Sequence, residues 1–120
     1  MTYTQEQLAI ADEHIPRVNL KEFYNDTNSK VMIDVRQLEE LEASGTIKDA
    51  LHMPKGVIEF RANSSEDIDF DTSIYVFCAV GVRSALAGYN LKKIGYQNVY
   101  NLVGFQDILD QGAEILLLNN

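Results

Sequence analysis

The chain contains 120 residues, of which 46% are hydrophobic and 23% charged, the balance of one ordinary globular domain. Its 18 acidic residues outnumber the 10 basic ones, and the net charge of −8 argues against binding to the phosphate backbone of a nucleic acid. We find no apolar run of about 18 residues that would cross a membrane, and the first residues lack the basic start and apolar core of a secretory signal.

Three helices and one buried strand are predicted in the first 45 residues. The helices cover 4–14, 20–24 and 37–43, and the strand covers 31–33. The first helix should end near Pro16, because proline disfavours helical backbone in the residue before it. Asn19 is a suitable N-cap for the second helix, and Gly45 is a stop signal for the third.

The next segment is predicted to be mostly irregular. We expect a loop over 48–54, a short helix or irregular stretch over 57–61, and a solvated acidic connection over 64–71. The carboxylates of that connection could suggest a cation site. The stretch lacks the glycine and the roughly twelve-residue ligand pattern of a calcium loop, so a solvated surface is preferred.

Strands and helices alternate through the second half. The run 74–77 is short, β-branched and aromatic, which predicts a buried strand. A helix over 84–93, a strand over 98–102 and a helix over 105–111 follow, while 113–118 could be helix or strand. This alternation predicts an α/β domain with a mostly parallel sheet and helices on both faces. Ligands of such sheets collect at the carboxyl ends of the strands, where Cys78 and Asp34 are expected.

Cys78 is the only cysteine, and it lies between the strand at 74–77 and a loop that leads into a helix. A lone cysteine at a strand end is most often a small buried hydrophobe. Here the thiol is aimed at the positive end of a helix, where free N–H groups stabilise anions. Gly81 permits backbone geometry that other residues resist, and Arg83 adds a cation. The loop therefore predicts a cradle for an anionic sulfur or oxyanion.

Metal chemistry and disulfide chemistry have little support in the sequence. The cysteine and the distant His14 and His52 show no metal-ligand spacing, so we predict no metal and no other cofactor. We interpret His52 as structural and His14 as a surface residue. One cysteine cannot form an internal disulfide, and a reducing, cytoplasmic setting is the simplest fit.

Three ordered motifs resemble those of the rhodanese-like (sulfurtransferase) family. They cover 33–54, 75–96 and 98–105. The resemblance spans roughly Ile15 to Gly112 and implies a rhodanese-like three-layer domain over 15–118, with 1–14 as a helical extension. Three positions depart from the family pattern and are interpreted as packing positions. Thr46 replaces a histidine, Val103 replaces one of two glycines, and Ile108 lies near the place of a tryptophan.

The resemblance implies transfer of sulfane sulfur through a persulfide on Cys78. The donor would be thiosulfate or a persulfide, and the acceptor a thiol, cyanide or a protein. The implied binding loop consists of Ala79, Val80, Gly81, Val82, Arg83 and Ser84. We expect the backbone N–H groups of 79–83 to surround the sulfur. Because some thiosulfate-using relatives carry basic residues at the positions of the uncharged Ala79 and Val80, the donor remains open.

Three charged residues have two interpretations each. Arg83 could hold an anionic group of the donor, or it could fix the loop through a carboxylate such as Asp34. The second role is preferred, because Arg83 opens the helix. Asp34 and Arg36 could act as an acid–base pair, although fixing loops by hydrogen bonds and ion pairing is preferred for both. Arg36 could also border the pocket.

Two rival functions belong to other classes. Phosphatases and arsenate reductases of this fold need a Cys-x5-Arg loop, whereas only four residues separate Cys78 from Arg83. The shorter loop suits a single sulfur atom better than a phosphoryl group. The other rival is a non-enzymatic sulfur-relay or protein-interaction module, for which the acidic surface would suit a basic partner.

Overall fold

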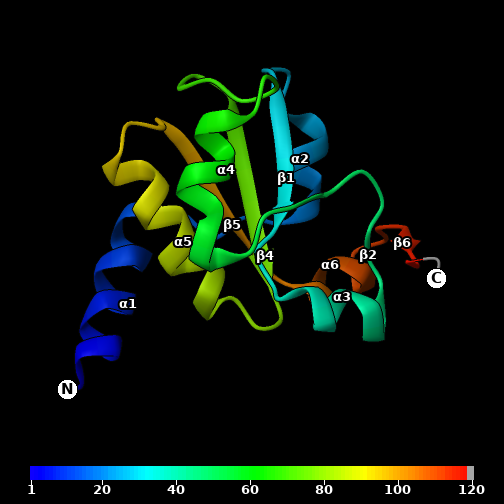
Figure 1. Ribbon diagram of the computed structural model, residues 1–120, viewed down its shortest axis with the longest axis horizontal. Coiled ribbons are helices and arrows are strands. Elements are labelled where there is room, and N and C mark those ends of the chain that lie inside the picture. Colours follow the sequence, from blue (N-terminus) through cyan, green and yellow to red (C-terminus); the bar gives the residue numbers. More distant parts are fainter. Residues whose placement is uncertain (119–120) are drawn as a thin grey trace.

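The computed structural model describes residues 1–118 and is built on a central sheet of four strands (Figure 1). The strands lie in the order β3 (Leu51–His52), β1 (Lys30–Asp34), β4 (Ser73–Cys78) and β5 (Asn98–Gly104). All neighbouring pairs are parallel. Every residue of β4 is buried, as expected for an inner strand that is covered on both faces.

Helices cover both faces of this sheet. On one face α4 (Ile58–Ser64) and α5 (Val82–Lys93) share a hydrophobic core with β1 and β4, and α1 (Tyr3–His14) packs against α5. The other face carries α2 (Leu20–Asn25) and α6 (Phe105–Asp110), which share a second core with Tyr75 and Phe77. The predicted three-layer α/β arrangement with a mostly parallel sheet is confirmed.

The remaining elements are a short helix, a small pair of strands and a 3₁₀ turn. The helix α3 (Leu38–Ser44) lies beyond the carboxyl ends of the strands, at the lower end of the sheet in Figure 1. A small antiparallel pair joins β2 (Thr46–Ile47) to β6 (Ile115–Leu116). A 3₁₀ turn, η1 (Lys55–Val57), leads into α4.

Three predictions need correction or completion. The loop predicted over 48–54 is wrong at Leu51–His52, because these residues pair with Ile33 and Asp34 as the edge strand β3. Two residues are too few for a pattern of alternating burial to be read from the sequence. The undecided stretch 113–118 contains the strand β6, and the undecided stretch 57–61 belongs largely to α4.

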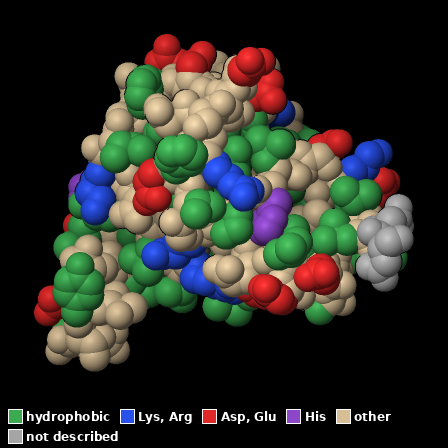
Figure 2. Space-filling view, in the orientation of Figure 1, with side chains coloured by type: hydrophobic (Ala, Val, Ile, Leu, Met, Phe, Trp, Pro, Cys, Tyr) green, Lys and Arg blue, Asp and Glu red, His purple; other side chains and the backbone are tan. Residues whose placement is uncertain are grey.

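The acidic side chains of the connection between α4 and β4 are exposed, as predicted, whereas Ile68 of the same connection is buried in the core. The exposed carboxylates are those of Glu66, Asp67, Asp69 and Asp71. Figure 2 shows acidic side chains gathered at the upper end of the molecule, where Figure 1 places this connection. Within residues 1–118, no helix has both the length and the apolar character needed to cross a bilayer.

A bulge interrupts the pairing of β4 with β5. Val76 pairs with Asn101 whereas Phe77 pairs with Val103, so Leu102 is an extra residue on β5. Val103 has a φ of 77°, in the left-handed region that β-branched residues rarely adopt. Because of the bulge, the consecutive residues Asn101 and Leu102 are both buried.

The backbone of Asn101 is also tied to the segment that follows α1. Its N–H donates to the carbonyl of Pro16 at 2.9 Å, and its carbonyl accepts the N–H of Val18 at 2.9 Å. The two bonds place the chain around Arg17 alongside β5 as an isolated parallel bridge. One outer strand of the sheet is therefore covered at this point by residues 16–18.

Candidate functional site

The turn between β4 and α5, residues 78–84, is called the Cys78 loop below. Gly81 has a φ of 98°, and a Cβ atom at this position would approach Cγ1 of Val103 to 2.7 Å. Only glycine meets both conditions without strain. The resulting tight turn brings the N–H of Gly81 to 3.0 Å from Sγ of Cys78 and the N–H of Ser84 to 3.4 Å from the same atom. Gly81 lies within the range 79–83 in which N–H donors were expected, whereas Ser84 lies one residue beyond it.

The environment of Cys78 acts on its pKa in two directions. Cys78 has no exposed surface, and burial raises the pKa of a thiol because it disfavours the charged form. The hydroxyl of Ser84 and the backbone N–H groups of Ser84, Gly81 and Val80 act in the opposite direction. These hydrogen bonds outweigh burial and hold the pKa of Cys78 below its usual value. A larger share of the sulfur is therefore thiolate at neutral pH.

Asn101 fixes the Cys78 loop and was not selected in the sequence analysis. Its Oδ1 lies 2.7 Å from Oγ of Ser84 and accepts the N–H of Val103 at 2.9 Å. Its Nδ2 donates to the carbonyl of Gly81 at 3.1 Å. One buried amide therefore holds Gly81 and Ser84, two residues whose N–H groups point at Sγ of Cys78.

The hydroxyl of Ser84 has two neighbours and only one proton. It lies 2.7 Å from Oδ1 of Asn101 and 3.4 Å from Sγ of Cys78. The bond from Nδ2 of Asn101 to the carbonyl of Gly81 fixes the orientation of the amide, so that Oδ1 faces Ser84. Because an amide oxygen only accepts hydrogen bonds, the hydroxyl of Ser84 donates to Asn101 while Cys78 is a thiol. The hydroxyl can turn to donate to the sulfur once the thiol has ionised.

Asp34 and Arg36 form a buried ion pair at the end of β1. Nη2 of Arg36 lies 2.8 Å from Oδ2 of Asp34, and the backbone N–H of Arg36 donates to Oδ1 at 3.1 Å. The guanidinium also donates to the carbonyl of Gly45 at 2.8 Å and lies over the ring of Phe105. Thr46 donates its hydroxyl to Oδ2 of Asp34 at 2.8 Å, so this departure from the family pattern is more than a packing position. The geometry is that of residues which hold loops in place.

Arg83 is paired with Glu40 of α3 rather than with Asp34. Both guanidinium Nη atoms contact the carboxylate of Glu40, and Nη2 lies 2.8 Å from Oε2. Asp34 is already occupied by Arg36, which explains why the suggested partner is wrong. The hydrogen bond from Arg83 lowers the pKa of Glu40 to about 2, so this carboxylate is ionised at neutral pH. The pair joins the start of α5 to the start of α3.

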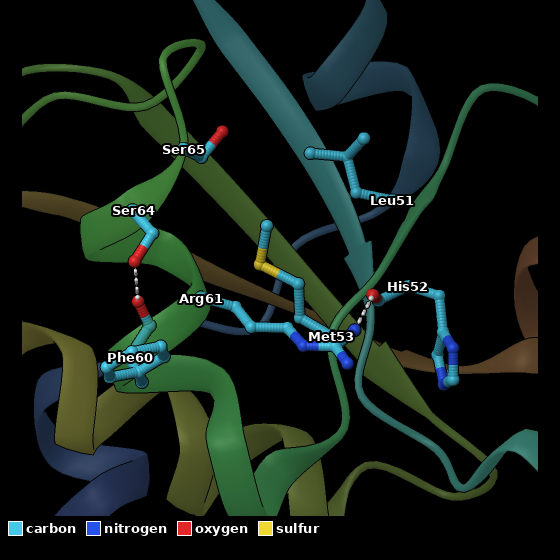
Figure 3. A pocket seen from close by; sticks show the side chains of 7 residues that line it. All are labelled: Leu51, His52, Met53, Phe60, Arg61, Ser64 and Ser65. Atoms are coloured by element: carbon cyan, nitrogen blue, oxygen red, sulfur yellow. Dashed lines mark hydrogen bonds between the residues drawn. The ribbon is translucent and has the colours of Figure 1, made fainter.

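A separate hollow of about 290 Å³ lies between β3 and α4 (Figure 3). Leu51, Met53 and Phe60 contribute apolar walls, and Arg61 reaches the carbonyl of His52 at 3.4 Å. No residue of the Cys78 loop lines it. Nε2 of His52 is hydrogen-bonded to the carbonyl of Arg36 at 2.8 Å, a structural contact. Among residues 1–118, no group of three or more His, Cys, Asp or Glu side chains is placed to hold a metal ion.

Comparison with known families decides the family of the chain. Residues 18–108 match the rhodanese-like domain. The chain belongs to the rhodanese-like family. The Cys78 loop lies within the matched residues. Tyr3–His14, the helix α1, precedes the matched residues.

Individual relatives are described as proteins of sulfur transfer or sulfur carriage. The Bacillus subtilis protein YrkF, described as a candidate sulfur carrier, is 36% identical over 97 residues, which are 78% of this chain and 50% of that protein. This chain therefore spans half the length of that relative. The polysulfide-sulfur transferase homodimer of Wolinella succinogenes superposes with a TM-score of 0.75 at 28% identity, over 97% of this chain and 88% of the other.

A third similar structure carries information on the fold alone. A Rhodopseudomonas palustris protein of unknown function, described as a candidate tyrosine phosphatase, superposes with a TM-score of 0.78 over 97% of this chain and 96% of the other. The sequence identity is 24%. At that level the likeness extends to the rhodanese-like architecture and no further.

Proposed function

We propose that this chain is a sulfurtransferase that carries sulfane sulfur as a persulfide on Cys78. The observation that carries the proposal is the set of N–H groups around Sγ, at 3.0 Å from Gly81 and 3.4 Å from Ser84, at the start of α5. Such donors favour an anionic sulfur over the thiol. In this proposal Cys78 is the nucleophile, residues 79–84 form the persulfide-binding loop, and Asp34 and Arg36 support it.

The proposed reaction has two steps. The thiolate of Cys78 attacks the outer sulfur of a donor, so that the bond from Sγ to this sulfur forms while the bond from the sulfur to the donor breaks. The donor leaves with the electron pair, as sulfite from thiosulfate or as a thiolate from a persulfide. A thiol or cyanide then attacks the outer sulfur of the persulfide, and Cys78 leaves as the original thiolate.

Access to the sulfur sets a condition on this reaction. Cys78 has no exposed surface, whereas Val80 beside it is 73% exposed. Some rearrangement of the residues around Cys78 is therefore needed before a donor can reach Sγ. No metal or other cofactor takes part in the proposal, and the reducing cytoplasm remains the proposed location because the reaction needs a free thiol.

Mass spectrometry of the intact protein tests the proposal. Incubation with polysulfide or thiosulfate should add the mass of one sulfur atom, cyanide should remove it as thiocyanate, and Cys78→Ser should abolish both changes. No mass gain with any sulfane donor would contradict the proposal. Hydrolysis of an aryl phosphate that is lost in Cys78→Ser would favour the phosphatase alternative, which the four-residue spacing from Cys78 to Arg83 disfavours.

A second candidate function is sulfur relay to a protein. It is favoured by the description of the relative YrkF as a candidate sulfur carrier. In a relay the persulfide forms as above, but small thiols and cyanide remove it slowly and a protein acceptor removes it quickly. The rates of the second step with small acceptors therefore separate the two functions.

A further inference from the structure

Arg83 of the Cys78 loop and Arg36 at the end of β1 are both paired with carboxylates. Arg36 is buried against Asp34, and Arg83 contacts Glu40 with two nitrogens. The loop positions between Cys78 and Arg83 are Ala79, Val80, Gly81 and Val82, which carry no charge. Attraction of an anion to the sulfur therefore depends mainly on the loop N–H groups and the start of α5.

The pair between Arg83 and Glu40 differs from the buried one in its contact with solvent. The side chains of Arg83 and Glu40 are 34% and 32% exposed, whereas those of Arg36 and Asp34 are 4% and 0% exposed. A donor in solution can therefore come close to Arg83, but it meets a cation and a carboxylate together. A donor with two negative charges gains little there, because repulsion by Glu40 offsets attraction by Arg83.

We propose that Glu40 is a specificity-determining residue that makes the site select singly charged sulfane donors over dianionic thiosulfate. This inference rests on the proposed sulfurtransferase function and adds the class of donor. Glu40 acts through Arg83 and has no part in the bond changes at sulfur. A persulfide on a small thiol belongs to the favoured class when the thiol carries no net charge of its own, because such a donor lacks the two negative charges of thiosulfate.

Two probes isolate the charge of the donor. Thiosulfate and methanethiosulfonate have similar tetrahedral shapes, but a methyl group of the second replaces one charged oxygen of the first. Each gives its outer sulfur to the Cys78 thiolate. Thiosulfate leaves as sulfite and methanethiosulfonate leaves as methanesulfinate, and each leaving group takes the electron pair of the broken S–S bond. The ratio of kcat/KM for methanethiosulfonate to that for thiosulfate, measured with cyanide as acceptor, reports the preference.

Glu40→Gln removes the carboxylate and leaves Arg83 free to attract the donor. We expect the ratio to fall about tenfold at low ionic strength, through a lower KM for thiosulfate, and the effect to shrink as salt is added. Glu39→Gln removes the same charge from the same helix without touching the pair, because Glu39 lies in no ion pair among residues 1–118. This control should leave the ratio within about twofold of the parent.

Arg83→Gln is a second test, in which the ratio should change in the opposite direction, and it does not depend on the stability of the Glu40 variant. It leaves Glu40 uncompensated, so the ratio should rise. An unchanged ratio in Glu40→Gln, or equal shifts in Glu40→Gln and Glu39→Gln, would overturn the inference while persulfide formation on Cys78 still supports the proposed function. Absence of any mass gain from both donors would overturn the proposed function, and the inference with it.

Discussion

The side chain of Asn101 and the hydroxyl of Ser84 lie 2.7 Å apart beneath the sulfur of Cys78. The same amide also binds the carbonyl of Gly81 and the N–H of Val103. A single buried residue on β5 thus helps to hold the shape of a loop that follows β4. Since its partners are backbone groups and one hydroxyl, Asn101 is a positioning residue for the candidate nucleophile.

Asn101→Ala should therefore lower both the stability and the reactivity of the thiol. Two buried polar groups and one partly buried group lose this partner, and we expect a loss of about 2–3 kcal/mol in the free energy of unfolding, measured with urea. The midpoint of the pH profile for alkylation of Cys78 should move to higher pH, because the N–H groups no longer hold their geometry. Asn98→Ala on the same strand removes only an exposed bond to the carbonyl of Asp71 and serves as control. A stability loss without any change in the alkylation profile would contradict the positioning role.

Asp34→Ala should be among the most destabilising single substitutions. It leaves the buried guanidinium of Arg36 without its counter-ion and the hydroxyl of Thr46 without its acceptor. We expect a loss of about 3–5 kcal/mol in the free energy of unfolding. Asp12→Ala removes an exposed partner of Arg17 at 3.4 Å and should change stability by less than about 0.5 kcal/mol. Comparable losses in the two variants, measured by urea denaturation, would show that burial of the first pair does not matter.

Glu40→Gln should reduce stability in a way that depends on pH. The pKa of Glu40 is lowered from 4.5 to about 2 by its hydrogen bond with Arg83, so ionisation of this carboxylate favours the folded state. The contribution is complete above pH 4.5 and is lost as the pH falls to about 2. We expect a cost of about 0.5–1 kcal/mol at neutral pH, because the pair is partly exposed. Urea denaturation at several pH values would contradict this if the difference between variant and parent stayed constant down to about pH 2.

Val103→Gly should be tolerated far better than removal of a neighbouring valine. Glycine adopts the φ of 77° without strain, and this gain offsets the loss of a partly buried side chain and the greater freedom of the unfolded chain. We expect the free energy of unfolding to stay within about 1 kcal/mol of the parent. Val99→Gly removes a buried side chain from the same strand and should cost about 3 kcal/mol or more. Equal losses in the two variants would mean that the backbone of Val103 is not strained.

Much of the fold could be predicted from local patterns. The buried run before Cys78 and the alternation of strands with helices were sufficient for the parallel sheet and its two helical layers. The two-residue strands β2, β3 and β6 could not be predicted, because each is defined by its partner and too short to show a period. The start of α5 at Val82 rather than 84 follows from the left-handed turn at Gly81.

The candidate site was predictable only in part. Cys78 and its loop are contiguous, so the strand, the glycine and the helix could be recognised together. Asn101 lies next to the bulge in β5, and its side chain bonds to the loop. The bulge could not be predicted from the order of the residues around Asn101. Glu40 lies within the predicted helix over 37–43, and nothing in the sequence links it to Arg83. Arg36 already pairs with Asp34, and Arg83 pairs with Glu40 instead. Which arginine pairs with which carboxylate depends on the folded arrangement of these residues and could not be predicted from their order in the sequence.

The backbone bonds of Asn101 with Pro16 and Val18 give the N-terminal segment a mechanical link to the sulfur. The segment 16–18 follows α1, and Asn101 is its point of attachment to β5. Cutting the chain at this segment, or pulling it away by force on α1, would release the backbone of the residue whose side chain secures Gly81 and Ser84. We therefore expect such a change at residues 16–18 to alter the reactivity of Cys78 with no contact at the loop itself.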